Sequence, residues 1–113
     1  MSRRDVAWLR DILEAIDAIT EYLEAGNLSQ GIVYDACRAR LIEIGEAVKG
    51  LDPDLLATEP DVPWRSIARM RDHLAHRYFD TDHAIVQDVV HNELARLRSA
   101  VEALLARSSD GTE

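Results

Sequence analysis

The sequence contains few of the residues that interrupt helices. Its 113 residues include only five Gly and three Pro, and all three Pro lie between positions 53 and 63. Long stretches therefore run without a breaker, and they are rich in Ala, Leu, Glu and Arg, which favour helices. No segment alternates apolar and polar residues as a half-buried strand does. We therefore expect an all-helical chain.

Cysteine and long apolar runs are also nearly absent. The single Cys37 cannot form a disulfide within the chain, and its helical context indicates a small buried apolar residue. No apolar run approaches the roughly 18 residues of a membrane span. The start of the sequence, Met-Ser-Arg-Arg-Asp, is not followed by the apolar core of a signal peptide. We expect a cytoplasmic protein without a membrane contact.

Positive charge is scarce overall but concentrated in one segment. The formal net charge is −8 and the sequence pI is near 4.9, a balance that favours solubility or a basic partner and counts against nucleic acid. Residues 65–77, however, hold four Arg and one Asp, a local charge of 4 − 1 = +3. By contrast, the first 24 residues hold three Arg and six acidic residues. This segment is therefore the natural place to look for an anion site.

Apolar residues three and four positions apart predict four amphipathic helices. We expect them over residues 4–25, over 29–49 with Ser29 as N-cap, from 64 until the pattern falters at 78–80, and over 83–106. Asp80, Thr81 or Asp82 would cap the last helix, and the loop at 51–63 could hold a helical turn at 53–57. These elements predict an all-α, antiparallel up-and-down bundle of four to five helices. Residues 1–107 would form one domain and residues 108–113 a flexible tail.

The segment from residue 70 to 79 places ionisable groups beside aromatic ones. On an ideal helix, Arg69, His73 and His76 share one face, and Arg71 lies about 140° from His76. Arg71 and His76 can act together if the helix bends or ends near His76, or if each of two chains contributes a pair. A two-fold symmetric dimer is thus one of two arrangements that would unite them.

These two residue types fit metal-free cleavage of RNA, in which the 2′-OH attacks the adjacent phosphate. That reaction needs a general base, a general acid and a cation to stabilise the developing phosphorane. Histidine titrates near neutral pH and suits proton transfer, and arginine stays charged and grips phosphate oxygens with a fork of donors. One Arg and one His, doubled across a two-fold axis, would supply all of these groups.

The same residues carry a resemblance to a known family. Arg71, four residues, His76, one residue and Tyr78 resemble the RX4HXY signature of HepT-like toxins in the HEPN superfamily. Residues 41–47 (LIEIGEA) look like the family's I-G-E-A segment, and residues 63–71 (PWRSIARMR) look like its P-W-x-x-I-x-x-M-R approach. The resemblance covers roughly residues 5–105. One departure is Asp72, where the family often has Asn; a carboxylate there can orient Arg71 and also competes with phosphate for it.

The resemblance implies a HEPN-like homodimer with the motif in a cleft between protomers. It further implies an endoribonuclease, the toxin of a toxin–antitoxin pair, that needs no metal or other cofactor and uses Arg71 and His76 for catalysis. The partner would be a nucleotidyltransferase antitoxin of the MNT kind, which in such pairs can adenylylate the tyrosine matching Tyr78. Added phosphates would then occupy the anion site. The substrate would be RNA, with tRNA among the candidates.

The remaining residues of the segment receive supporting roles. We expect Asp72 to orient Arg71, Tyr78 to contact substrate and to be the modified residue, and Arg69 and His73 to bind or support substrate. His73 and His76 form an H-x-x-H pair, but no third ligand stands at a diagnostic spacing, so we expect no metal site.

Two other interpretations remain open from the sequence. Arg71 could be an ion-paired surface arginine, bonded to Asp72 or to Glu43 and Glu46. The chain would then be a non-catalytic helical dimer that binds a nucleotidyltransferase partner or a nucleotide, in line with its acidic charge. In the third interpretation it is a purely structural helical protein, and changes in the motif alter only stability.

Overall fold

A computed structural model describes the backbone of residues 1–76 and 79–111, and the side chains of these residues except 79, 80 and 108–111. Within these ranges the chain forms helices and no strand, which confirms the all-α prediction. The elements are α1 (Arg3–Ala25), α2 (Gly31–Gly50), α3 (Pro53–Leu56), α4 (Trp64–Ala75), α5 (Phe79–Asn92) and α6 (Leu94–Gly111).

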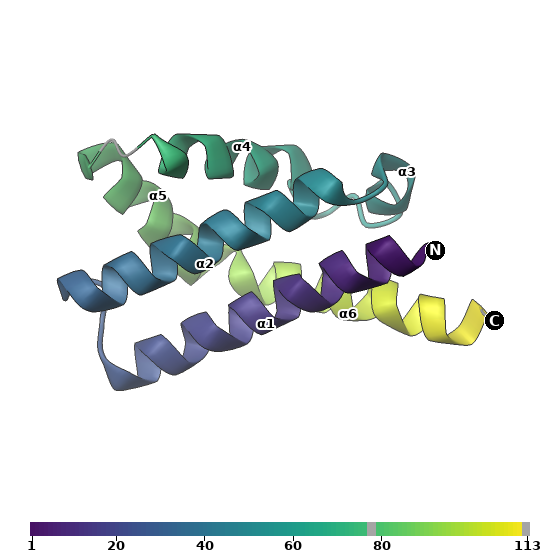
Figure 1. Cartoon of the computed structure of the whole chain (residues 1–113), viewed down its shortest axis with the longest axis horizontal. Coiled ribbons are helices and arrows are strands. Elements are labelled where there is room, and N and C mark those ends of the chain that lie inside the picture. The colour runs from purple at the N-terminus through teal and green to yellow at the C-terminus, as the bar shows by residue number, and fades with distance from the viewer. Residues whose placement is uncertain (77–78, 112–113) are drawn as a thin grey trace.

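The helices run up and down in chain order (Figure 1). α1 and α2 lie side by side and antiparallel, α4 packs along the other side of α2, and α6 returns to contact α1. The short α3 sits in the loop between α2 and α4, as predicted for residues 53–57. α2 is therefore the central helix, and it carries the surface on which α4 rests.

One apolar core runs through the bundle and explains these elements. Each long helix turns a stripe of apolar side chains inward, which is the arrangement that the three-and-four spacing predicts. Side chains with at most 1% exposure include Leu9, Ile12, Ile19, Leu41, Ile44, Leu74, Val86, Leu97, Val101 and Leu104. No helix of the described residues is both long enough and apolar enough to cross a membrane.

The start of α2 differs from the prediction, because Ser29 is not its N-cap. The helix begins at Gly31 after Gln30, which makes no capping hydrogen bond with its side chain. The Ser29 backbone N–H instead donates to Asn27 Oδ1 at 2.9 Å, and the Ser29 hydroxyl bonds the same oxygen. The Asn27 side chain thus forms a local turn that engages Ser29 before the helix starts.

The last predicted helix also differs, because it begins earlier and is divided. α5 starts at Phe79, so Asp80, Thr81 and Asp82 lie inside it and none is its N-cap. Glu93 separates α5 from α6, although the hydrogen bonds from the Glu93 N–H to the Val89 carbonyl and from the Leu97 N–H to the Glu93 carbonyl continue the ladder across it. α6 then extends past the predicted end at residue 106, to Gly111.

Candidate functional site

Arg71 owes its position to a close contact between α4 and α2. On the inner face of α4, Ile67, Met70 and Leu74 are buried against the core, and Arg71 lies at the edge of this stripe. A Cβ at Gly45 of α2 would stand 2.4 Å from the Arg71 Cβ and 3.2 Å from the Ile67 carbonyl oxygen. Only a glycine therefore lets α4 approach so closely. Gly45 thus determines the distance between the Arg71 backbone and α2.

The Arg71 guanidinium is engaged by two carboxylates. Its Nε and Nη2 atoms lie 3.2 and 3.1 Å from Glu46 Oε2, and Nη1 lies 3.3 Å from Asp72 Oδ1. Lys49 Nζ approaches the same Asp72 oxygen at 3.2 Å, so two cations and two anions form a neutral network. The hydrogen bond from Lys49, followed by the weaker contribution of Arg71, holds the pKa of Asp72 below its ordinary value of 3.8.

These contacts show which of the carboxylates that the sequence offered as partners of Arg71 are paired with it. The ion pairs with Asp72 and Glu46 that we considered are both present. Glu43, the other candidate partner, instead bonds Arg40 one turn back on its own helix, at 3.1 Å. The Arg71 side chain remains 33% exposed, so its pairs face solvent. The chain without RNA therefore holds Arg71 in a defined direction by contacts that water can compete with.

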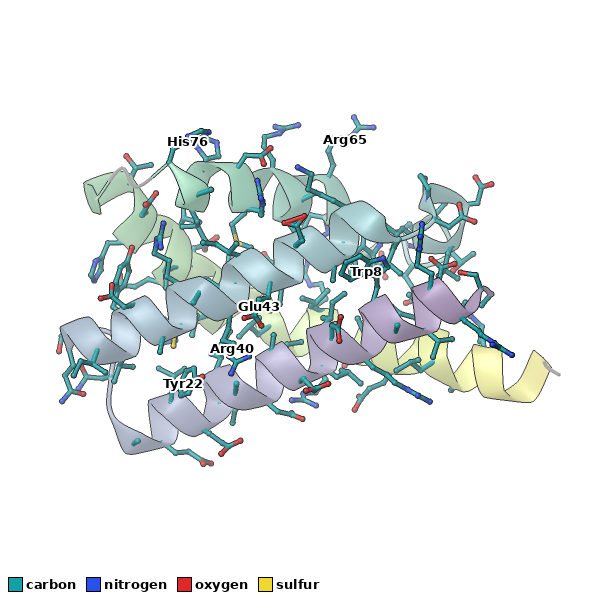
Figure 2. The ribbon with its side chains drawn as sticks, viewed as in Figure 1. Trp8, Tyr22, Arg40, Glu43, Arg65 and His76 are labelled. Atoms are coloured by element: carbon teal, nitrogen blue, oxygen red, sulfur yellow. The ribbon has the colours of Figure 1, made fainter. Side chains whose placement is uncertain are left out.

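His76 stands where α4 ends. Ala75 is the last helical residue, and His76 is the C-cap, with φ −91° and ψ −5°; its backbone N–H donates to the His73 carbonyl at 3.2 Å. The side chain is exposed, and Figure 2 shows it at the outer end of α4. The helix thus stops before residues 78–80, where we expected it to falter. An end near His76 is one of the two conditions under which Arg71 and His76 could act together.

Arg38 of α2 contacts both the end of α4 and the first turns of α5. The Arg38 guanidinium of α2 donates to the Leu74 carbonyl in the last turn of α4, and its Nε lies 3.9 Å from Asp82 Oδ2 in α5. Asp82 is only 2% exposed. Arg38 therefore ties the end of α4 to the first turns of α5.

Sequence reasoning did not find this role of Arg38 and Asp82. The available signal was a charge inside an apolar stripe. Arg38 lies four residues after Tyr34 and three before Leu41, both of which are buried. A charged residue at such a position needs a buried partner. Nearby, the Tyr34 ring stacks on His83 of α5 with centroids 4.2 Å apart, and burial raises the pKa of Tyr34.

Arg69 and His73 lie on the outer face of α4, away from Arg71. Both side chains are exposed and border a hollow of about 220 Å³ between α4 and α5. Tyr78 lies outside the described residues, so its predicted contact and modification stay predictions. Among the described residues, no three His, Cys, Asp or Glu side chains gather as a metal ion would need. Cys37 is fully buried, as predicted, and burial raises the pKa of its thiol.

The two tryptophans occupy different settings. Trp64 is buried in the core, and its Nε1 donates to the Glu59 carbonyl at 2.9 Å. Trp8 is half-buried against Gly50 and borders a second hollow, between α1 and α2. Figure 2 shows Trp8, Arg40 and Glu43 on this side of the molecule. The charged residues around the hollow are Asp11, Glu14, Arg40, Glu43 and Glu46. Four acids against one Arg make this surface a poor site for phosphate.

Comparison with known proteins identifies one family. The family model described as Ribonuclease HepT-like matches residues 12–104. The chain is 35% identical over 109 residues to a protein of Thermococcus cleftensis named "Probable ribonuclease HepT", covering 92% of this chain and 98% of that protein. It is 33% identical over 110 residues to a candidate RNase of Methanocaldococcus jannaschii, covering 93% and 91%. A candidate RNase of Caldanaerobacter subterraneus subsp. tengcongensis is 38% identical over 104 residues, covering 88% and 93%. No solved structure gives a significant match.

Proposed function

Because the chain belongs to the HepT-like ribonuclease family, we propose that it is an endoribonuclease that cuts RNA without a metal ion, with Arg71 and His76 at the reacting phosphate. The observation that carries the proposal is the placement of these two residues. An exposed histidine ends α4, and an arginine with a fixed direction lies five residues before it. These are the groups that metal-free cleavage needs.

In the proposed reaction the 2′-oxygen attacks the neighbouring phosphorus. One His76 accepts the proton of the 2′-OH, and a second His76, from the other protomer of a homodimer, donates a proton to the departing 5′-oxygen. The bond from phosphorus to the 5′-oxygen breaks, which leaves a 2′,3′-cyclic phosphate and a 5′-OH. Arg71 bridges the phosphate oxygens, whose negative charge grows at the phosphorane. After this step the first His76 is protonated and the second is neutral. Hydrolysis of the cyclic phosphate, or proton exchange with solvent, restores the starting protonation states.

Arg71 must exchange carboxylates for phosphate when RNA binds. Its bonds to Glu46 and Asp72 are solvent-exposed, and pairs of this kind contribute about 0–1 kcal/mol. A phosphate diester presents oxygens that the guanidinium fork can take in their place. Asp72, the neighbour in sequence, stays within reach and orients Arg71. Arg69 and His73 support the substrate from the outer face, and Tyr78 contacts it.

The proposal extends to a partner and to regulation. We propose that the chain is the cytoplasmic toxin of a pair, a homodimer with the motif in the cleft between protomers. Its antitoxin would be an MNT-type nucleotidyltransferase that adenylylates Tyr78. An adenylyl group two residues after His76 would place new negative charge beside the phosphate site and repel RNA. The RNA substrate would include tRNA among its candidates.

The chemistry can be tested on a short RNA of defined sequence. We expect the purified chain to yield 2′,3′-cyclic phosphate ends in the presence of EDTA and to leave the RNA intact when the nucleotide 5′ of the cut carries 2′-deoxyribose. Arg71→Ala and His76→Ala should each lower the cleavage rate by at least about 100-fold, the lower range for loss of an acid–base or charge-stabilising group. Cleavage of the deoxy substrate, or 3′-OH ends, would contradict the mechanism.

A second candidate function draws on the ion pairs of Arg71. If Glu46 and Asp72 hold this arginine permanently, the chain is a non-catalytic helical dimer that binds a nucleotidyltransferase or a nucleotide. This alternative predicts tight partner binding and intact RNA, even when mass spectrometry shows Tyr78 unmodified. Cleavage of RNA by the unmodified parent would exclude it, whereas cleavage gained only in Asp72→Asn, which removes one of the competing charges, would support it.

A further inference from the structure

The outer face of α4 carries a row of exposed side chains that leads to His76. Arg65, Arg69, His73 and His76 are all exposed and follow one another at four, four and three residues. Side chains at these intervals lie on one side of a helix, about one turn apart. Figure 2 shows Arg65 and His76 near the two ends of this side of α4, both pointing away from α2. We call these four residues the outer row.

The cations of the outer row lack the partners that Arg71 has. Within the described residues, no ion pair and no side-chain hydrogen bond involves Arg65 or Arg69. The chain has 21 acidic residues against 13 basic ones, so carboxylates are plentiful elsewhere on its surface. Two adjacent unpaired arginines on an acidic protein are therefore open to an anionic ligand that comes from outside.

The hollow between α4 and α5 adjoins this row. It measures about 220 Å³ and is bordered by Arg69 and His73, with apolar walls from Met70, Ile85 and Val89. This volume is below the roughly 300–1,000 Å³ of pockets that enclose whole small molecules, so it suits a single ring. Unstacked RNA bases bind against apolar and Arg surfaces of this kind. Asp88, also on the rim, offers an acceptor to a base amino group.

We propose that the outer row is the track on which the RNA strand continues from the cut phosphate, with Arg65 and Arg69 on successive phosphates and one base in the hollow. The inference rests on the proposed function for its direction, because the row ends at His76. It adds a binding surface beyond the reacting phosphate, on the face of α4 opposite to Arg71.

The track can be measured without cleavage. A fluorescent 2′-O-methyl oligoribonucleotide, which has no free 2′-OH, serves as the probe in titrations at several salt concentrations. Each phosphate contact on a single strand contributes about 0.7 to the slope of log affinity against log salt. The double change Arg65→Gln and Arg69→Gln should therefore weaken binding and flatten the slope by about 1.4.

Arg10→Gln is the control, because Arg10 is also exposed but lies on α1 beside Asp11. The control should bind the probe as the parent does. Equal affinity and equal slope for the double variant and the control would overturn the track. So would a parent chain that does not bind the probe at all.

A second measurement separates this inference from the proposed reaction. With cleavable RNA, the double variant should lose about tenfold more kcat/KM on a long substrate than on a dinucleotide, which has one phosphate and cannot follow the row. Equal losses on both substrates would overturn the track while leaving the nuclease in place. If the parent cuts neither substrate but the probe results hold, the track stands and the proposed reaction fails.

The base in the hollow has its own test. Asp88→Asn converts the acceptor at the rim into a group that also donates, without altering Arg65 or Arg69. We expect a changed base preference next to the cut, or among probe sequences. The slope of log affinity against log salt, which reports the number of phosphate contacts, should change only by the small effect of one charge. An identical preference in the parent and in Asp88→Asn would remove the base from the hollow.

Discussion

Arginines occur on both faces of α4, and their surroundings differ. On the inner face, packing against Gly45 brings Arg71 to Glu46 of α2, and Asp72 completes its pairing. On the outer face, Arg65 and Arg69 have no carboxylate partner among the described residues. The net charge of the whole chain, −8, therefore does not indicate the local charge on either face of α4. What decides the availability of each arginine is which helix packs against it.

The difference assigns different tasks to the two faces. An arginine whose backbone is fixed by close packing on Gly45 suits a single position on the reacting phosphate, since pre-positioned groups lose less entropy when they bind. Exposed, unpaired arginines suit a backbone that passes over them.

Removing the cation of the buried Arg38–Asp82 pair, which lies near the end of α4, should have the largest effect on stability. Arg38→Met leaves Asp82, which is 2% exposed, without its cation, and a buried charge without a partner costs about 3–5 kcal/mol. The free energy of unfolding, measured with urea, should fall by that amount. Arg98→Met is the matched control, because Arg98 pairs with Asp17 at the surface and should cost at most about 1 kcal/mol. Equal losses would show that the Arg38 pair does not anchor α4 to α5.

Gly45→Ala should disturb the inner face of α4 more than the outer face. The added methyl would meet the Arg71 Cβ at 2.4 Å, and overpacking of this kind costs about 1–3 kcal/mol. The shift of α4 should also lower cleavage through Arg71 more than it lowers binding of the 2′-O-methyl probe. Gly31→Ala is the control, since nothing lies within 4 Å of its new methyl. A Gly45→Ala chain as stable as the parent would contradict the close packing.

Glu46→Gln should leave Arg71 with one of its two carboxylate partners, Asp72, and so bring it closer to the arginines of the outer face. Losing one exposed pair changes stability by less than about 1 kcal/mol, and the released guanidinium should bind RNA a few-fold more tightly. KM for a short RNA measures this effect. Glu43→Gln serves as the control, because Glu43 pairs with Arg40 and not with Arg71. If both variants raise the affinity equally, the gain comes from net charge and not from Arg71.

The smallest effect concerns the pH dependence of Asp72. Its pKa lies below the ordinary 3.8, chiefly through the hydrogen bond from Lys49. A lowered pKa means that the contribution of the pair to stability is present above 3.8 and is lost as the pH falls through the lower, folded-state pKa. A carboxyl carbon NMR titration should show this pKa, and Lys49→Met should raise it more than Arg71→Met. An Asp72 that titrates at 3.8 or above would contradict the network.

The sequence predicted local features well and long-range ones poorly. Scarce Gly and Pro, together with the apolar stripes, were enough for the main helices and for the end of α1 at Ala25, because these depend on neighbouring residues. The pairing of Arg71 with Asp72 could be expected because the two are adjacent. The choice of Glu46 over Glu43, by contrast, depends on where α4 crosses α2, which spacing along one helix does not reveal.

The same limit explains the residues that sequence reasoning missed. Arg38 and the Leu74 carbonyl are 36 residues apart, and Asp82 looked like a helix cap because acids are common at that position. Only the packed bundle shows that Asp82 turns inward to Arg38. Ser29 failed as a cap for a similar reason, since Asn27 competes for it. Polar residues near a helix end have several partners available, and the fold decides among them.

The most direct test of the account is to incubate the purified, unmodified chain and His76→Ala with total RNA and with a tRNA pool in the presence of EDTA. We expect cleavage by the parent alone, with 2′,3′-cyclic phosphate ends, while His76→Ala, which changes an exposed side chain, keeps the stability of the parent. Intact RNA with both proteins, when mass spectrometry shows Tyr78 unmodified, would contradict it and favour the non-catalytic binding module.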